Sequence, residues 1–166
     1  MSKEQSLVVV KPDAMQKGLM GAIMDKLAEE GLEIVGAKVI EVTQELAEEH
    51  YQHLKEEKFF AELIKYITGS YHTKNVLALV YQGDAACKHI RDIIGVTNPE
   101  EANPTSLRGK YGRITTKGVF ENVVHASESA EEAEREIKLW FRPNELTETN
   151  FPIKSEKTER LESFWK

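Results

Sequence analysis

Cysteine is nearly absent from this sequence, since Cys87 is the only one in 166 residues. A single cysteine excludes an internal disulfide and indicates a reducing compartment, so we expect a cytoplasmic protein. The N-terminus, Met1 to Gln5, lacks the apolar segment and the small-residue cleavage site of a secretory signal. No apolar run approaches the roughly 20 residues that cross a bilayer, and we therefore expect no membrane segment.

Two glycine-rich phosphate-binding motifs are also missing. Neither the P-loop pattern nor the Rossmann pattern G-x-G-x-x-G occurs, so any bound phosphate must be held by side chains. The formal net charge of -6 argues against broad nucleic-acid binding driven by charge. The RNA-binding aromatic motif is not found on a predicted strand either, and we expect no specific nucleic-acid partner. A small anionic ligand needs only a few converging Lys and Arg side chains.

What is present is the composition of a globular protein, with 40% hydrophobic and 30% charged residues. The length of 166 residues suits one compact domain with a real core. We place this domain in residues 1–146, followed by a C-terminal tail in residues 147–166. The tail has no core of its own, so we expect it to pack on the domain or on a neighbouring subunit. Its isolated apolar residues are Phe151, Phe164 and Trp165.

Hydrophobic periodicity predicts an α+β fold. Short runs rich in Val, Ile and Leu indicate four strands, and apolar residues at helical spacing indicate helices between and after them. The order fits a ferredoxin-like β-α-β-β-α-β antiparallel sheet with an inserted helical hairpin, a last helix and a C-terminal extension. The expected strands are residues 6–10, 33–42, 75–81 and 119–124, and the expected helices begin after Gly18 and near residues 46, 59, 86 and 130.

The last predicted strand delivers a histidine to the start of a helix. Ser129, with Glu132 three residues later, has the capping-box form that opens a helix. His125 therefore lies where the N–H groups of a helix start are exposed, a place that favours anions such as phosphate. Glu136, on the same helix, is placed to orient the imidazole ring. Taken alone, the pattern also fits a half-buried histidine with satisfied hydrogen bonds.

Positive side chains lie near predicted strand ends and in the long loop of residues 96–117. Lys11 follows the first strand, Arg91 lies on the helix after the third strand, and Arg108 lies in the loop. Each one alone is explained as a solvated surface charge. Together with His125 they predict a phosphate clamp, because Lys and Arg neutralise charge that spreads over phosphoryl oxygens in the transition state. Further polar residues of this region are Thr97 and Asn122.

Six segments of the chain carry a specific set of motifs. They are Val10-Lys11-Pro12-Asp13, His50-Tyr51 with Phe59-Phe60, Thr97-Asn98-Pro99, Leu107-Arg108-Gly109, Asn122-Val123-Val124-His125-Ala126-Ser127-Glu128-Ser129, and Glu136-Ile137-Lys138-Leu139-Trp140-Phe141. In this order they closely resemble the nucleoside diphosphate kinase family, over roughly residues 6–146. Against the family's usual pattern, extra residues stand around residues 69–75 and 110–121.

The resemblance implies a phosphotransferase in which His125 is the nucleophile. The histidine would take the terminal phosphoryl of a nucleoside triphosphate, typically ATP, and hold it as phosphohistidine. It would then pass the phosphoryl to a nucleoside diphosphate, which is a ping-pong mechanism. By the family pattern Glu136 sets the tautomer of the ring, Ser127 steadies Glu136, and Lys11 takes part in catalysis. The residues implied to contact the nucleotide are Lys11, Tyr51, Phe59, Leu63, Arg91, Thr97, Arg108 and Asn122.

The same resemblance implies how the rest of the substrate is held. Phe59 would stack on the base with Leu63 nearby, although both residues also fit a core role on the apolar face of their predicted helix. Stacking tolerates any base, so low base specificity follows. Mg²⁺ would arrive with the phosphates and keep several waters, so no dedicated metal ligands are expected. Members of the family form homo-oligomers, and we expect one here.

Two rival functions fit parts of the sequence. His50 and His53 are spaced i,i+3, as in a metal-dependent hydrolase, but no carboxylate or cysteine cluster with ligand spacing accompanies them. Two exposed helix histidines are the ordinary explanation. A nucleotide-binding or assembly module would leave His125 unused. Against the module, the lysine, arginines, asparagine, histidine and glutamate of the family pattern are all present.

Overall fold

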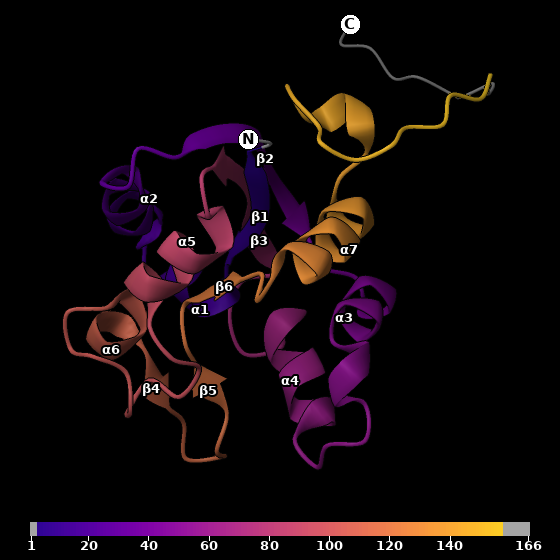
Figure 1. Ribbon diagram of the computed structural model, residues 1–166. Coiled ribbons are helices and arrows are strands. Elements are labelled where there is room, and N and C mark those ends of the chain that lie inside the picture. The colour runs from indigo at the N-terminus through magenta and orange to yellow at the C-terminus, as the bar shows by residue number, and fades with distance from the viewer. Residues whose placement is uncertain (1–2, 158–166) are drawn as a thin grey trace, which may run out of the picture.

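The computed structural model describes residues 3–157 and is built around a four-stranded antiparallel sheet (Figure 1). The strand order β2-β3-β1-β6 is that of a ferredoxin-like fold, as the sequence predicted. β1 is central, because it pairs with β3 along one side and with β6 along the other. The strands are β1 (Glu4–Val10), β2 (Glu33–Glu41), β3 (Asn75–Gly83) and β6 (Val124–Ala126).

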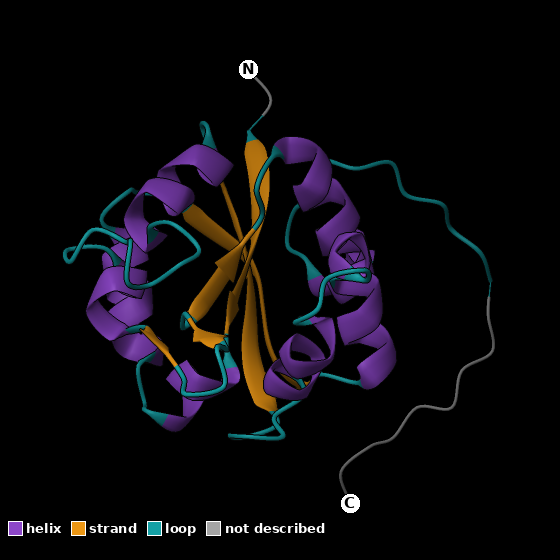
Figure 2. Cartoon of the chain, turned by 90° about the horizontal axis from the view of Figure 1, so that it is seen from below, coloured by secondary structure: helices purple, strands orange, loops and turns teal. Residues whose placement is uncertain are grey.

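Helices cover both faces of this sheet (Figure 2). Alternate side chains of a strand point to opposite faces, so Leu7 and Val9 enter one core while Val8 and Val10 enter the other. The Val8 core is closed by the two crossover helices α2 (Met20–Ala28) and α5 (Ala86–Ile94), with the short helices α1 (Pro12–Gln16) and α6 (Leu107–Tyr111). The Val9 core is closed by α3 (Gln44–His50), α4 (Phe60–Ile67) and α7 (Ala130–Trp140).

The helical hairpin expected between the second and third strands is confirmed. Thr43 opens α3 as its N-cap, since the hydroxyl oxygen accepts a hydrogen bond from the Leu46 N–H. After α3 the chain makes one 3₁₀ turn, η1 (Gln52–Leu54), and α4 then runs back along α3 (Figure 1). The hairpin therefore sets the end of α3 beside α7 and beneath the sheet edge that carries β6.

The expected strand over residues 119–124 is wrong in one respect. Its first part is β5 (Phe120–Glu121), which pairs with β4 (Arg113–Ile114) in a separate hairpin outside the main sheet. The chain then turns sharply at Val123, whose φ is +61° and whose neighbours close an i to i+2 hydrogen bond, Val124 N–H to the Asn122 carbonyl, at 2.7 Å. This is the rarer, strained form of the γ-turn, and a left-handed β-branched residue costs about 1–3 kcal/mol.

The first part of the C-terminal tail, residues 147–151, contacts the domain. After the 3₁₀ turn η2 (Pro143–Glu145), the Thr147 N–H donates to the Val35 carbonyl at 2.8 Å, and Phe151 packs against the Val9 core. Residues 152–157 are exposed. The expectations for Phe164 and Trp165 lie outside the described residues. Within residues 3–157, no helix combines the length and apolar character that crossing a bilayer requires.

Candidate active site

His125 lies in the middle of β6, paired with Val9 of β1, and not after the strand end as the sequence suggested. Because the γ-turn at Val123 interrupts the expected strand, β6 begins only at Val124, and His125 therefore lies inside the strand. The helix that follows begins as expected, because the Ser129 hydroxyl oxygen accepts the Glu132 N–H at 3.3 Å. The His125 side chain is 16% exposed, so one part of the ring is open to a ligand.

Glu136 of α7 holds the His125 ring from the protein side. His125 Nε2 lies 3.0 Å from one oxygen of the carboxylate and 3.1 Å from the other. Ser127 donates its hydroxyl proton to Glu136 at 2.6 Å and accepts the Leu7 N–H at 3.1 Å. The serine is thereby tied to β1, and it fixes the carboxylate that faces the histidine.

The electrostatics of this pair keep the carboxylate ionised. Burial alone would raise the pKa of Glu136, but the charge of His125 and the hydrogen bond from it, with further contributions from His50 and Ser127, lower that pKa to about 2. Burial lowers the pKa of His125 below its usual value near 6.5, while the carboxylate partly opposes that shift. Near neutral pH the pair is therefore a neutral imidazole beside a carboxylate, and the carboxylate can only accept a hydrogen bond.

Lys11 brings a buried ammonium group to the same end of the sheet. The residue directly follows β1, and its Nζ donates to the Asn122 side-chain oxygen at 2.7 Å. The Asn122 amide donates in turn to the Thr97 carbonyl at 2.9 Å, so three of the expected residues form one chain of hydrogen bonds. Burial, and then the charge of Arg108, lower the pKa of Lys11 to about 7. A buried cation of this kind gains stability when an anion arrives.

Arg108 and Tyr51 are the other buried polar residues among the expected nucleotide contacts. The Arg108 guanidinium donates to the Val124 carbonyl at 2.9 Å and to the Gly95 carbonyl at 2.9 Å. Burial, and next the charge of Arg91, lower its pKa to about 10, so it stays charged at neutral pH. The Tyr51 hydroxyl is buried without a protein partner, and burial raises its pKa. It is a donor that lacks an acceptor until a ligand supplies one.

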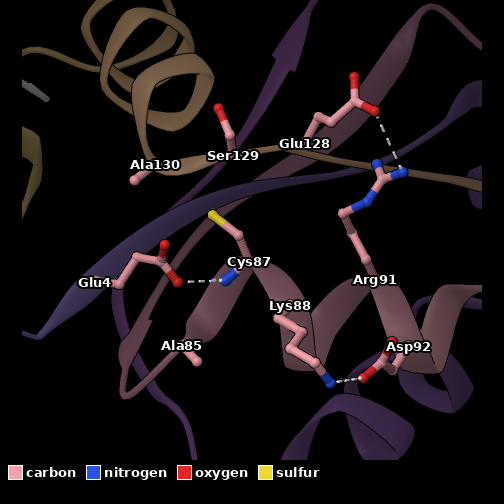
Figure 3. Close-up of a pocket in the computed structure, with 9 residues that line it drawn as sticks. All are labelled: Glu4, Ala85, Cys87, Lys88, Arg91, Asp92, Glu128, Ser129 and Ala130. Carbon is pink, nitrogen blue, oxygen red and sulfur yellow. Dashed lines mark hydrogen bonds and ion pairs between the residues drawn. The ribbon is translucent and has the colours of Figure 1, made fainter.

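Arg91 is paired with a carboxylate in this structure. It lies 3.7 Å from Glu128, across a pocket between the starts of α5 and α7 (Figure 3). Glu4, Cys87 and Ser129 also line this pocket, whereas His125 does not. The prediction that Arg91 contacts the phosphates therefore requires its side chain to turn from Glu128.

Phe59 and Leu63, the two residues expected near the base, differ in burial. Phe59 directly precedes α4 and is 50% exposed, so the core role that competed with base stacking does not describe it. Leu63 is half-buried and packs against the Val9 core. Phe59 thus offers a flat apolar ring to a ligand, and Leu63 contributes mainly to packing.

The two stretches of extra residues contact each other. His72 Nε2 lies 2.9 Å from the Glu121 carboxylate, which also accepts from Arg113 at 2.6 Å. Lys117 stands over the Tyr71 ring, 5.0 Å from its centre. The contacts join the segment after α4 to the β4–β5 hairpin, next to Asn122. The extra residues therefore hold the β4–β5 hairpin, which ends directly before Asn122, against the segment after α4.

His50 is a site residue that the sequence analysis missed. It is the last residue of α3 and almost fully buried, with its ring centre 4.5 Å from that of His125. The suggestion of two exposed histidines is wrong for His50, while His53 is exposed. The sequence signals for His50 were its place directly before Tyr51 and its helical spacing from the apolar residues Leu46 and Ala47. In the described part of the chain, His50, His125 and Glu136 form a cluster whose potential metal-ligand atoms lie within 4.8 Å of one another.

Taken together, the fold and the site define a class of enzyme. A neutral histidine oriented by a buried carboxylate and faced by buried cations suits attack on an anionic group, and a ferredoxin-like sheet carries it. That class is a phosphotransferase. The sequence pattern of one family, described as nucleoside diphosphate kinase, matches residues 4–146. The chain belongs to the nucleoside diphosphate kinase family and is an enzyme, a nucleotide-binding kinase.

Similar proteins agree in sequence and in structure. The nucleoside diphosphate kinase of Pyrococcus horikoshii is 43% identical over 145 residues, covering 87% of this chain and 89% of that protein. The Halobacterium salinarum enzyme, solved in complex with CDP, superposes with a TM-score of 0.80 at 36% identity, over 90% of this chain and 94% of that one. The Borrelia burgdorferi enzyme, solved as a transition-state mimic with bound vanadate and ADP, superposes with a TM-score of 0.79 at 30% identity. The match covers 92% of this chain and 94% of that one.

Proposed function

We propose that this nucleoside diphosphate kinase transfers phosphoryl groups in two steps through a phosphohistidine on His125. The observation that supports this most is the contact of His125 Nε2 with the ionised Glu136 carboxylate at 3.0 Å. Because a carboxylate accepts only, Nε2 carries the ring proton and Nδ1 keeps its lone pair. Nδ1 is therefore the nucleophile.

In the first step the Nδ1 lone pair forms a bond to the terminal phosphorus of the nucleoside triphosphate. The bond between that phosphorus and the bridging oxygen breaks, and the nucleoside diphosphate leaves with its electron pair. The phosphorylated ring is a cation, which Glu136 stabilises through the proton on Nε2. In the second step a terminal oxygen of the acceptor diphosphate attacks the phosphorus, and Nδ1 leaves as a neutral ring nitrogen.

The buried cations would neutralise the charge of the transferred group. Lys11 and Arg108 are the positive residues already fixed by hydrogen bonds, and the Tyr51 hydroxyl is a free donor. Arg91 would join them by leaving Glu128. Asn122 and Thr97 hold Lys11 in place. Donors that are placed before the reaction need little rearrangement as charge develops, which is the largest source of catalysis in many enzymes.

We propose that Mg²⁺ enters as part of the nucleotide substrate, bound to phosphate oxygens, where it supplies charge neutralisation. Mg²⁺ prefers oxygen ligands and retains waters. The cluster of His50, His125 and Glu136 offers two ring nitrogens and one carboxylate oxygen, so it does not suit this ion. The metal ligands would thus belong mainly to the substrate.

The base would stack on Phe59, whose exposed ring reads the flat face of any base. This supports low base specificity. The structures of relatives with CDP and with ADP fit the same expectation for the family. Nucleoside di- and triphosphates of several bases would therefore serve as substrates.

We further propose a cytoplasmic homo-oligomer with a catalytic domain in residues 1–146 and a packing tail in residues 147–166. The edge strand β2 supports the oligomer, since no other strand of residues 3–157 pairs with its outer side and it exposes Ile34 and Val39. The buried, free Cys87 is compatible with a reducing compartment.

Labelling with ATP that is radioactive in its terminal phosphate tests the two-step mechanism. Wild type, His125→Gln and the matched control His53→Gln are incubated without acceptor, and a non-adenine diphosphate is then added. We expect wild type and His53→Gln to take up acid-labile, alkali-stable label and to pass it to the acceptor, while His125→Gln does neither. Equal labelling of His125→Gln, or a wild type that never labels, contradicts the proposal.

A further inference from the structure

His50 lies behind His125 in a cage of aromatic rings. Its ring centre is 4.5 Å from those of His125 and Tyr51 and 5.5 Å from that of Trp140, in each case edge to face. Nothing in the proposed chemistry uses this buried histidine. Burial of a polar ring is costly when its nitrogens lack partners, and Trp140 and Glu136 are the polar side chains that face the two nitrogens.

Trp140 determines which nitrogen of His50 carries the proton. The indole Nε1 lies 3.1 Å from His50 Nδ1, and an indole N–H can only donate. Nδ1 must therefore be the acceptor. In a neutral ring the proton then belongs to Nε2, and burial together with the charge of His125 lowers the pKa of His50 well below 6.5, which keeps the ring neutral.

The proton on His50 Nε2 faces the Glu136 carboxylate, which in turn orients His125. Nε2 lies 3.7 Å from the Glu136 oxygen that is 3.0 Å from His125 Nε2. This is longer than a hydrogen bond, so the effect on Glu136 is electrostatic. A positive ring edge beside the carboxylate favours its ionised form, and an ionised Glu136 can only accept from His125.

The backbone around His50 is also tied to α7. The Arg135 guanidinium donates to the carbonyls of His50 and Glu49, at 3.1 and 3.3 Å, and so closes the end of α3. Trp140, Glu136 and Arg135 all belong to α7. One helix therefore fixes both the position of His50 and its tautomer.

We propose that Trp140 and His50 are positioning residues for His125, in which the indole N–H locks His50 as its Nε2–H tautomer and thereby closes the His50–His125–Glu136 cluster to divalent metal ions. Two imidazoles and a carboxylate within 4.8 Å would otherwise be a suitable set of zinc ligands. A metal at His50 Nε2 needs that nitrogen unprotonated. The proton would then move to Nδ1, where it meets the Trp140 N–H, and two donors would face each other in a buried place. This role rests on the proposed function of His125 as the nucleophile.

The first test is the tautomer of His50 in the wild-type protein. Two-bond ¹H–¹⁵N correlation spectra of ¹⁵N-histidine-labelled protein at neutral pH distinguish the protonated from the unprotonated ring nitrogen, with His50→Gln assigning the signal. We expect protonated Nε2 and unprotonated Nδ1. A wild-type His50 that carries its proton on Nδ1 overturns the proposal, and this measurement needs no folded Trp140 variant. It is also independent of activity, so failure of His125 to label with ATP would defeat the proposed function without touching this result.

The second test is zinc binding to wild type, Trp140→Phe and Trp140→Phe/His50→Gln, measured by calorimetry with zinc chloride alone. Phenylalanine keeps the ring and removes the donor, so His50 is free to change tautomer. We expect zinc affinity to rise about tenfold in Trp140→Phe and to return to the wild-type level in the double variant. His53→Gln, which removes an exposed histidine of the next turn, should change nothing. A Trp140→Phe protein with the wild-type tautomer, or with the wild-type zinc affinity, overturns the proposal.

Discussion

The proposed phosphate end and the proposed base end of the candidate site are built in opposite ways. At the phosphate end, Lys11, Arg108 and Glu136 are buried, and each is held by hydrogen bonds before any ligand arrives. At the base end, Phe59 is half exposed at the start of α4. The buried hydrogen bonds are thus concentrated where the proposed reaction would develop charge. The base would be left with a surface contact that distinguishes little between bases.

This difference follows from the costs of burial. A buried cation or carboxylate is tolerated only when partners compensate for lost water, so the buried residues of the phosphate end need protein partners in place before a ligand binds. An apolar ring at the surface has no such requirement. Changes at the phosphate end should therefore act on the chemical step, and changes at the base end should act on substrate binding.

The largest of these effects is expected for Glu136→Gln. The amide can donate as well as accept, so it permits the wrong tautomer of His125 and removes the charge that stabilises the phosphorylated ring. We expect kcat to fall about 10³-fold with little change in KM. Steady-state kinetics measure this, and Glu134→Gln on the same helix is the control. A fall in kcat of less than about tenfold would show that the carboxylate does not set the tautomer.

Lys11→Gln should have the next largest effect. Glutamine can keep a hydrogen bond to Asn122, but it cannot neutralise a phosphoryl oxygen. The expected loss in kcat is about 10²-fold, as for other single groups that stabilise transition-state charge. Lys17→Gln is the matched control, because Lys17 is more exposed and lies 3.9 Å from Glu121. Equal losses in the two variants would place Lys11 outside the chemistry.

The pH dependence sharpens the same comparison. Attack needs the neutral His125 ring. Because the pKa of His125 is lowered, the acid-side fall in kcat/KM should begin below pH 6.5. Lys11 has a pKa of about 7 and loses its charge above that pH, so kcat/KM should fall again on the alkaline side. Bound phosphates favour the charged lysine, and kcat should therefore stay level further into the alkaline range. Profiles from about pH 5 to about pH 9 test this.

Lys11→Arg provides the control for the alkaline limb. A guanidinium stays protonated across this range, so the limb should disappear from kcat/KM while the acid limb of His125 remains. An alkaline limb that is unchanged in Lys11→Arg would assign it to another group.

The smallest effect is expected for Phe59→Ala at the base end. Loss of one stacking contact should raise KM about tenfold for every nucleotide and leave kcat nearly unchanged. Adenine, guanine and cytosine diphosphates should be affected within about threefold of one another, because stacking is tolerant of the base. Leu63→Ala should instead lower the melting temperature. A large change in kcat, or a loss confined to one base, would break the contrast between the two ends.

The sequence predicted the regular parts of this fold well, because strand and helix periods reflect burial on one face. The sheet order, the helical hairpin and the Ser129 helix start all followed from such local patterns. The turn at Val123 did not, because a β-branched residue favours a strand. Its strained conformation is held by tertiary contacts, the burial of its side chain in the Val8 core and the hydrogen bond from the Lys11 N–H to its carbonyl at 2.9 Å.

The candidate site was predictable where a family motif named the residue, and less so where long-range packing decides its role. Lys11, Asn122, Ser127 and Glu136, which the motifs named, lie around His125 and the end of β1, while their roles stay predictions. The second role of Trp140 was hidden, because its helical position predicted only an apolar core residue. Its partner His50 lies far away in the sequence, and the bond between them exists only once α3 and α7 pack together.

The most direct test of this account is the position of the phosphoryl group on the His125 ring. Wild-type protein with ¹⁵N-labelled histidine is phosphorylated by ATP without acceptor, and ³¹P–¹⁵N couplings are measured at alkaline pH, where phosphohistidine persists. With Nε2 held by Glu136 at 3.0 Å, the account predicts a phosphoryl group on Nδ1. A phosphoryl group on Nε2, or on any residue other than His125, would contradict it.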